Sequence, residues 1–166
     1  MSSESELIIE PLNREHGRSS FNCGIESLDR YLKQQANQDI KRRISRVFIA
    51  RSPMDKKEVL GYYTLSTLSI DLSILPDRIV KKLPRHPVPA ALTGRFAVDI
   101  SAQGKGIGKL LLANAIKRTL AVSDDIAIYA MVVDAINEEA ESFYKRYGFS
   151  NLSHDCSRLF LPLNSF

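Results

Sequence analysis

Three glycines, Gly104, Gly106 and Gly108, alternate with other residues between a predicted strand and the start of a predicted helix. Because glycine has no Cβ, the backbone N–H groups of such a turn can point together at one site. The helix dipole adds partial positive charge there, and Lys105 and Lys109 add whole charges. The segment predicts a pyrophosphate-binding turn; a tight turn without a ligand is the alternative.

Two common phosphate motifs do not fit this spacing. A dinucleotide fingerprint, G-x-G-x-x-G, needs its third glycine one residue later than Gly108. A P-loop needs Ser or Thr after its lysine, but Leu110 follows Lys109. We therefore expect neither a dinucleotide site nor a P-loop.

Composition narrows the class of protein further. The chain has 166 residues, 44% of them hydrophobic, which predicts one globular domain over residues 1–166. Its net charge of +4 suits an anionic ligand or nucleic acid without requiring either. Cys23 and Cys156 are too few for a disulfide framework, and no Cys/His spacing resembles a metal site, so no metal is expected. Without a signal-peptide pattern or a long apolar run, a cytoplasmic location is expected.

Hydrophobic periodicity predicts a mixed sheet with helices on both faces. A helix over residues 25–43 has an apolar face at Ile25, Leu28, Leu32, Ala36 and Ile40. The glycine turn opens a second helix, with apolar residues Leu110, Leu111, Ala115, Ile116 and Leu120. A third helix covers 137–147 and ends at Gly148, and the proline-rich stretch 76–90 is predicted as a short helix and an extended loop. Strands are predicted over residues 7–9, 47–50, 59–70, 92–98, 126–133, 149–152 and 157–161.

The run Gln103–Gly108 resembles the Q/R-x-x-G-x-G/A signature of the GNAT acetyltransferases, and residues 94–99 and 137–149 also resemble that family. The resemblance implies an α/β (α+β) GNAT fold, a mixed, mostly antiparallel sheet of about six to seven strands. It also implies acetyl-CoA as cosubstrate. The implied cofactor-binding residues are Phe96, Ala97, Val98, Gln103, Gly104, Lys105, Gly106, Ile107, Gly108, Lys109, Asn137 and Tyr147.

Residues 21–32 resemble the F-x-C-G…L-D-x-[FY]-L opening of GNAT toxins from bacterial toxin–antitoxin modules, the TacT-like group, and residues 36–39 and 83–90 are also similar. Those toxins acetylate the α-amino group of aminoacyl-tRNA and stall translation. The resemblance therefore implies aminoacyl-tRNA as acceptor, a ribbon-helix-helix antitoxin and a homodimer, with no membrane contact.

The predicted acetyl transfer needs a neutral amine as nucleophile and a group that neutralises the departing thiolate. An α-amino group titrates near 7.7–8.0, and the electron-withdrawing ester of an aminoacyl-tRNA lowers that pKa further, so much of the amine is already nucleophilic at neutral pH without a strong base. His86 or Glu139 acting through water is the alternative. A phenol can donate a hydrogen bond, and a proton, to a thiolate, so Tyr144 is the predicted catalytic acid; packing into the core is the other interpretation of its aromatic ring.

Two basic groups are predicted to contact the phosphates of tRNA, although a solvated charged surface is the simpler interpretation of each. An enzyme acting on another amine (a protein N-terminus, polyamine or aminoglycoside) is the main alternative function. A module that binds acetyl-CoA without turnover is a third. The predicted tRNA-binding residues are Lys41, Arg42, Arg43 and Arg46 in one group and Arg78, Lys81, Lys82, Arg85 and His86 in the other.

Overall fold

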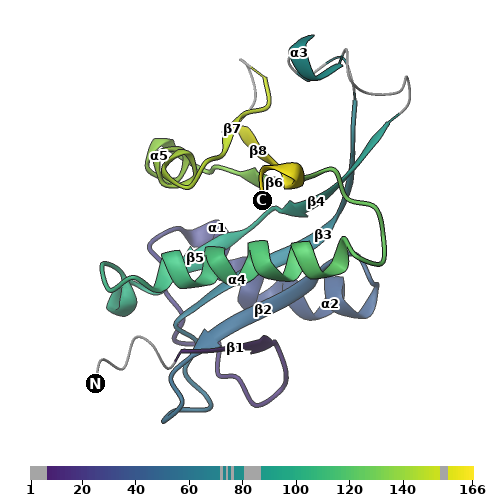
Figure 1. Ribbon diagram of the computed structural model, residues 1–166. Helices are drawn as coiled ribbons and strands as arrows, with labels where there is room; N and C mark the ends of the chain where they lie inside the picture. Colours follow the sequence, from purple (N-terminus) through teal and green to yellow (C-terminus); the bar gives the residue numbers. More distant parts are fainter. Residues whose placement is uncertain (1–6, 72, 74, 76, 81–86, 154–156) are drawn as a thin grey trace. The chain divides into compact units, whose positions relative to one another are not determined.

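The computed structural model describes residues 7–71, 73, 75, 77–80, 87–153 and 157–166 (Figure 1). The chain divides into two units, of which the first comprises residues 1–66 and 95–117 and the second residues 67–94 and 118–166. Strand β3 and helix α4 begin in the first unit and end in the second. No helix in the described part of the chain is long and apolar enough to cross a membrane.

Four strands build the sheet of the first unit. β2 (Arg46–Arg51) pairs antiparallel with β1 (Ile8–Pro11) on one side and with β3 (Gly61–Ile70) on the other. β3 also pairs antiparallel with β5 (Phe96–Val98), with Tyr62 opposite Ala97. The strands predicted over residues 7–9, 47–50 and 59–70 are thus confirmed to within a few residues.

The first predicted helix is helical through most of its length but contains a wider turn. α1 (Glu26–Arg30) leads into a π-helical turn, η2 (Tyr31–Gln35), and then into α2 (Ala36–Lys41). The predicted face is confirmed, because its residues all join one apolar cluster. In that cluster Leu28, Leu32 and Ala36 are buried, and Ile25 and Ile40 are partly buried.

α2 ends at Lys41, two residues before Arg43, which adopts a left-handed φ of 59°. The N–H of Ile44 donates to the carbonyl of Asp39 at 2.9 Å, and the N–H of Arg43 donates to that of Ile40 at 3.2 Å. This pair of bonds is a Schellman ending, in which Arg43 occupies the position that glycine usually takes. Arg43 therefore lies just beyond the helix rather than in its last turn.

Adjacent tyrosines in β3 face opposite sides of the first unit's sheet, as residue alternation in a strand requires. The Tyr62 hydroxyl donates to the Leu28 carbonyl at 2.6 Å, on the side of α1. The Tyr63 hydroxyl donates to Asn114 Oδ1 at 2.6 Å, on α4 (Ile107–Val122). The prediction of helices on both faces is therefore confirmed in this unit.

The second unit contains strands in the order β4-β6-β8-β7. β4 (Val88–Thr93) and β6 (Ala130–Asp134) run parallel, whereas β8 (Arg158–Pro162) pairs antiparallel with both β6 and β7 (Ser150–Asn151). With the antiparallel pairings of the first unit, this confirms a mixed, mostly antiparallel fold class, with eight strands among the described residues.

The two helices of this unit lie where they were predicted, with small differences at their ends. The short helix expected after Pro76 is α3 (Asp77–Val80), and the helix expected over 137–147 is α5 (Glu138–Arg146). Short 3₁₀ turns complete the chain: η4 (Ile100–Ala102) belongs to the first unit and η5 (Leu163–Ser165) to the second.

The prediction was wrong around the prolines. β4 already begins at Val88, although an extended loop was expected through residue 90. Pro89 has no N–H, but its carbonyl accepts the N–H of Tyr129 at 2.9 Å, so it still takes part in the sheet. The strand predicted over 92–98 is divided, because β4 ends at Thr93 and β5 begins at Phe96.

Two further details of the prediction were wrong. β6 starts at Ala130 rather than at Ile126, which is 65% exposed and donates its N–H to the carbonyl of Val122 as the helix α4 closes. On α4 itself Leu110 is 36% exposed, and Leu112 is buried in its place. Ile126 is exposed because it belongs to the last turn after α4, and Leu110 is exposed because of its position around that helix. An apolar residue type alone therefore does not predict burial here.

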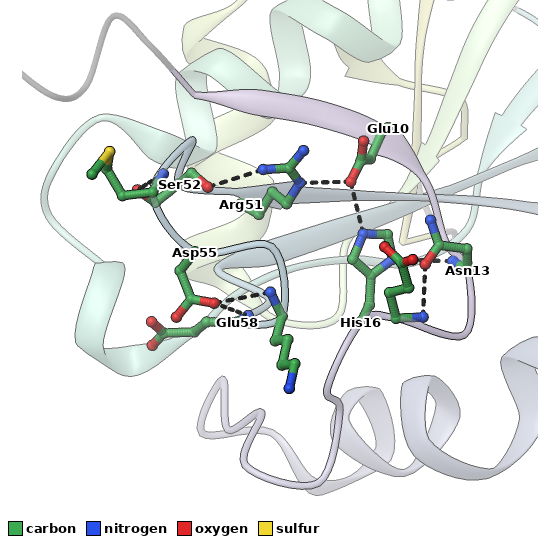
Figure 2. A network of polar contacts seen from close by, with 10 residues as sticks. Glu10, Asn13, His16, Arg51, Ser52, Asp55 and Glu58 are labelled. Atoms are coloured by element: carbon green, nitrogen blue, oxygen red, sulfur yellow. Dashed lines mark hydrogen bonds and ion pairs between the residues drawn. The ribbon is translucent and has the colours of Figure 1, made fainter.

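A polar network ties the start of the chain to the turn after β2 (Figure 2). Glu10 accepts hydrogen bonds from Arg51 Nε at 2.6 Å and from His16 Nε2 at 2.8 Å. The backbone N–H of Asn13 donates to His16 Nδ1 at 3.0 Å, so the proton of the neutral ring resides on Nε2. His16, 5% exposed, is a buried structural residue.

Replacing Glu10 with Gln should make stability less dependent on pH. Hydrogen bonds from Arg51 and then His16 hold the pKa of Glu10 below its usual 4.5. Its contribution to stability is therefore present above pH 4.5 and is lost as pH falls through the lowered pKa. Urea unfolding should show Glu10→Gln less stable than wild type at pH 7, with a difference that narrows in acid. The exposed Glu15→Gln is the control; a difference independent of pH would contradict the assignment.

Replacing Gly61 with Ala should destabilise the first unit. A Cβ at this position would lie 2.7 Å from Leu111 Cδ1 and 2.9 Å from the carbonyl oxygen of Ala97, so α4 or β5 would have to move. We expect the free energy of unfolding to fall by about 1–3 kcal/mol in urea titrations. Gly17→Ala is the matched control, because its Cβ would meet only the Lys57 carbonyl, at 3.5 Å. Equal stabilities of the two variants would show that the close approach at Gly61 is easily relieved.

Candidate active site

The glycine segment forms a turn between η4 and α4 in the first unit, so a 3₁₀ turn separates it from β5. Gly104 and Gly106 have φ values of +77° and +83°. A Cβ on either would meet nothing within 4 Å. Glycine is thus required here by the backbone conformation rather than by packing, and the space beside the turn is open to a ligand.

The first turn of α4 has the properties of an anion site. It follows the glycine turn directly and contains no acidic residue. Lys105 and Lys109 are both exposed beside it. The unpaired N–H groups and the dipole at the start of a 16-residue helix favour negative charge. The predicted pyrophosphate residues 103–109 therefore form one continuous segment with suitable chemistry.

Gln103 has a different role from that of its neighbours. Its side-chain Nε2 donates to the carbonyl of Val98 at 2.9 Å and to the carbonyl of Cys23 at 3.0 Å. Both amide hydrogens are thus used within the protein. Gln103 fastens the glycine turn to the end of β5 and to the N-terminal loop, so we interpret its side chain as a positioning group rather than a direct ligand of the cofactor.

Asp99, which the sequence analysis did not select, reinforces the same junction. It caps η4 by accepting the Ser101 N–H at 3.0 Å and hydroxyl at 2.8 Å, and it accepts the Asn22 N–H at 2.9 Å. The N–H of Ile100 returns a bond to the Asn22 carbonyl at 2.8 Å. Burial raises the pKa of Asp99, but the bonds from Asn22 and Ser101 outweigh it, and the net pKa is lowered.

Cys23 belongs to this junction as a structural residue. It is 8% exposed, and its N–H donates to Asp29 Oδ1 at 2.8 Å. Burial, followed by the interaction with Asp29, raises the pKa of the thiol to about 11. The thiol is therefore neutral at pH 7, and its buried environment is that of a small apolar residue rather than a nucleophile.

The backbone of β5 presents alternate residues to the two sides. The Asp99 N–H donates to the Leu60 carbonyl at 2.8 Å, and the Thr64 N–H donates to the Arg95 carbonyl at 3.0 Å. In an antiparallel ladder this alternation directs the N–H and C=O of Phe96 and Val98 away from β3. Both residues are among those that the sequence predicts to bind the cofactor.

In the second unit, α5 holds the predicted acid, Tyr144. The Asn137 side chain caps the helix by accepting the Ala140 N–H at 2.8 Å. At the other end the Phe149 N–H donates to the Tyr144 carbonyl at 3.2 Å and the Gly148 N–H to the Lys145 carbonyl at 3.1 Å. This is a second Schellman ending, and it confirms Gly148 as the residue that stops the helix.

Packing fixes the Tyr144 ring. It is 2% exposed, and its centroid lies 5.7 Å from that of Phe149 and 5.4 Å from that of Phe143. Burial, with a smaller contribution from the charge of Asp134, raises the pKa of the phenol. The hydroxyl is therefore protonated throughout the physiological pH range and can act as a hydrogen-bond donor.

The remaining predicted site residues have simpler positions. Asn137 is exposed and uses its side-chain oxygen as the helix cap, and Tyr147 is half-buried with its ring 5.2 Å from Phe143. Glu139 is exposed on the first turn of α5. In the part of the chain that is described, no group of three or more His, Cys, Asp or Glu side chains could hold a metal ion.

The first basic group is exposed at the end of α2 and the start of β2, and Arg78 is exposed on α3. The rest of the second group lies outside the described residues, as do the three consecutive residues 154–156. These residues are Lys81, Lys82, Arg85 and His86, and His154, Asp155 and Cys156.

Comparison with known proteins identifies the family. Residues 43–151 match the acetyltransferase (GNAT) domain. A protein named probable toxin TacT from Sinorhizobium fredii (strain NBRC 101917 / NGR234) is 33% identical over 96% of this chain and 92% of its own length. A protein named tRNA-acetylating toxin from Mycobacterium tuberculosis (strain ATCC 25618 / H37Rv) is 36% identical over 79% of this chain and 76% of its own.

Solved structures agree. A tyrosine-to-phenylalanine mutant of KacT superimposes with a TM-score of 0.90 at 33% identity, covering 96% of each chain. AtaT complexed with acetyl-methionyl-tRNAfMet gives 0.88 at 32% identity, also covering 96% of each chain. A mutant AtaT toxin bound to the C-terminus of the antitoxin AtaR and acetyl-CoA gives 0.82 at 29% identity, covering 96% of this chain and 95% of that one. This chain therefore belongs to the GNAT family of acetyltransferases.

Proposed function

We propose that this chain is an acetyl-CoA-dependent N-acetyltransferase toxin that acetylates the α-amino group of aminoacyl-tRNA and so blocks translation. The observation that carries the proposal is its likeness, over 96% of its length, to an AtaT structure that holds acetyl-methionyl-tRNAfMet. The relatives named as toxins support the same conclusion at 33% and 36% identity.

The first unit supplies the features needed to bind the donor. Acetyl-CoA supplies an acetyl thioester; the open glycine turn and the start of α4 fit its pyrophosphate, because they offer N–H groups and lysines without acidic residues nearby. The backbone N–H of Val98, which is directed away from β3, suits an extended amide-containing arm, while the Val98 carbonyl is already held by Gln103. Asn137 and Tyr147 are proposed as further cofactor contacts on the resemblance alone.

The reaction itself needs little acid–base help. The amine of an aminoacyl ester is largely neutral at physiological pH, attacks the thioester carbonyl and loses one proton, and the thiol of CoA leaves. Tyr144 is proposed to donate a hydrogen bond to the departing sulfur. Since its pKa is raised, its main contribution is that hydrogen bond to the thiolate rather than complete transfer of its proton.

The acceptor and partners follow from the same relatives. We propose that the exposed first basic group (Lys41, Arg42, Arg43 and Arg46) contacts tRNA phosphates, with Arg78 and its neighbours in the second group doing the same. An antitoxin is the expected inhibitor, since an AtaT structure is bound to the C-terminus of AtaR. A ribbon-helix-helix type of antitoxin, a homodimer, a single catalytic domain and a cytoplasmic location are further parts of the proposal.

The function is tested by incubating the purified protein with labelled acetyl-CoA and total aminoacyl-tRNA. Label should appear on the amino acid after ester hydrolysis. Deacylated tRNA should remain unlabelled, because it has no amine at its 3′ end. Efficient labelling of polyamines, aminoglycosides or protein N-termini, with none on aminoacyl-tRNA, would replace this proposal with the alternative of another amine.

Tyr144→Phe should retain acetyl-CoA binding and lose transfer. The substitution keeps the ring packed against Phe149 and removes only the hydroxyl, so we expect kcat to fall by about 10²–10⁴-fold. Because the pKa of Tyr144 is raised, the wild-type rate should not decline through its ionisation up to pH 10. Tyr129→Phe, in an apolar cluster of the same unit, is the control. Transfer at a near-native rate by Tyr144→Phe would remove it from the mechanism.

Lys109→Glu should weaken CoA binding while leaving the fold intact. A carboxylate in the first turn of α4 repels the pyrophosphate yet interacts favourably with the helix dipole, so affinity should fall about tenfold or more while thermal stability is kept or slightly raised. Lys117→Glu makes the same charge change on the same helix, away from its start, and should alter affinity far less. Equal losses in calorimetric titrations would place the phosphates elsewhere.

A further inference from the structure

Arg95 stands immediately before β5 and is held in an unusual way for an exposed cation. Its guanidinium carbon lies 3.8 Å from the centre of the Tyr31 ring. Its backbone is fixed to Thr64 on both sides, since its N–H donates to Thr64 Oγ1 at 3.1 Å and its carbonyl accepts the Thr64 N–H at 3.0 Å. Among the described residues, no carboxylate or carbonyl accepts a hydrogen bond from the guanidinium.

The ring beneath Arg95 is itself firmly positioned. Tyr31 is 4% exposed, stacks on Tyr62 at 6.2 Å between centroids and donates its hydroxyl to Asp39 Oδ2 at 2.8 Å. Gln35 Nε2 donates to the other oxygen of Asp39 at 3.1 Å. Burial and the bond to Asp39 raise the pKa of Tyr31 to about 12, so this hydrogen bond persists across the working pH range.

The π-helical turn explains why these groups meet. Tyr31 and Gln35 are its first and last residues, and Asp39 follows on α2. A π turn shifts the helical register by part of a turn and often occurs where function requires a particular side-chain placement. Here it directs Tyr31 at the buried carboxylate and leaves the ring face beneath Arg95. The guanidinium therefore rests over an aromatic ring whose position is fixed.

The position of Arg95 beside β5 indicates what its guanidinium binds. The glycine turn, at the other end of this strand, is where the phosphates of the donor are proposed to bind. Four residue steps of extended chain separate Arg95 from Asp99, about 13 Å, and the glycine turn lies beyond. An arm that pairs along β5 from that turn ends near Arg95, so the acceptor approaches there.

We propose that Arg95, positioned by the Tyr31–Asp39 pair, binds a phosphodiester next to the aminoacylated end of the acceptor RNA. A planar fork of N–H donors with a fixed charge matches phosphate oxygens. The inference rests on the proposed function, because it requires a nucleic-acid acceptor. Tyr31 and Asp39 are positioning residues that act through Arg95.

The test compares two acceptors, aminoacyl-tRNA and the methyl ester of the same amino acid, which has no phosphate. Arg95→Gln should raise KM for aminoacyl-tRNA about tenfold or more, with little change in kcat, and should make the dependence of binding on salt shallower by about one ion. Transfer to the methyl ester and calorimetric affinity for CoA should be unchanged. Arg95→Lys keeps the charge without the planar fork and should fall between Arg95→Gln and wild type.

Two further variants separate positioning from folding. Tyr31→Phe keeps the ring but loses the bond to Asp39, and it should raise KM for aminoacyl-tRNA less than Arg95→Gln does, with wild-type transfer to the methyl ester. Arg30→Gln removes an exposed arginine that pairs with Glu26 and should change neither KM nor salt dependence.

Equal losses on both acceptors, an altered CoA affinity, or wild-type KM and salt dependence in Arg95→Gln would each overturn the inference. Such results leave the proposed function standing if wild type still acetylates aminoacyl-tRNA. A wild-type protein that acetylates the methyl ester but no RNA would overturn the proposed function itself.

Discussion

The candidate donor site depends on a small set of hydrogen bonds that join two loops far apart in the chain. Asn22 and Asp99, separated by 77 positions, are linked directly, and Gln103 reaches from the glycine turn to Cys23 and Val98. These bonds fix where the turn leaves β5 and where α4 begins. Any helix N-terminus attracts anions. The hydrogen bonds of Asp99 and Gln103 add a fixed direction to the N–H groups at the start of α4.

Tyr62 connects this donor strand to the helical layer of the same unit. Its backbone lies opposite Ala97 of β5, its hydroxyl holds the Leu28 carbonyl, and its ring contacts both Phe21 and Tyr31. One buried side chain therefore couples the strand proposed to carry the cofactor with the stack that orients Arg95. In this arrangement the positions of donor and acceptor groups derive from a common core, which limits their relative motion.

Sequence alone was sufficient where the signals are local. The apolar period predicted the face of residues 25–43, the glycine pattern predicted the turn before α4, and Asn137 and Gly148 predicted the limits of α5. It failed where distant contacts decide. Asp99 finds Asn22 only after folding, and Pro89 enters a strand because its carbonyl alone is needed. The π turn leaves the spacing of apolar residues nearly unchanged, so no local sequence pattern predicts it. The roles of Tyr144 and of the cofactor residues stay predictions.

The ending of α2 has a consequence for how this protein balances stability against charge. A residue other than glycine with a left-handed backbone costs roughly 1–2 kcal/mol, and a cation near a helix C-terminus returns only about 0.3–1 kcal/mol. Folding alone would therefore favour glycine at position 43, yet the chain has arginine there with φ 59°. Such a position is a site of local frustration, because the conformational cost of the left-handed backbone exceeds what the charge returns at the helix end.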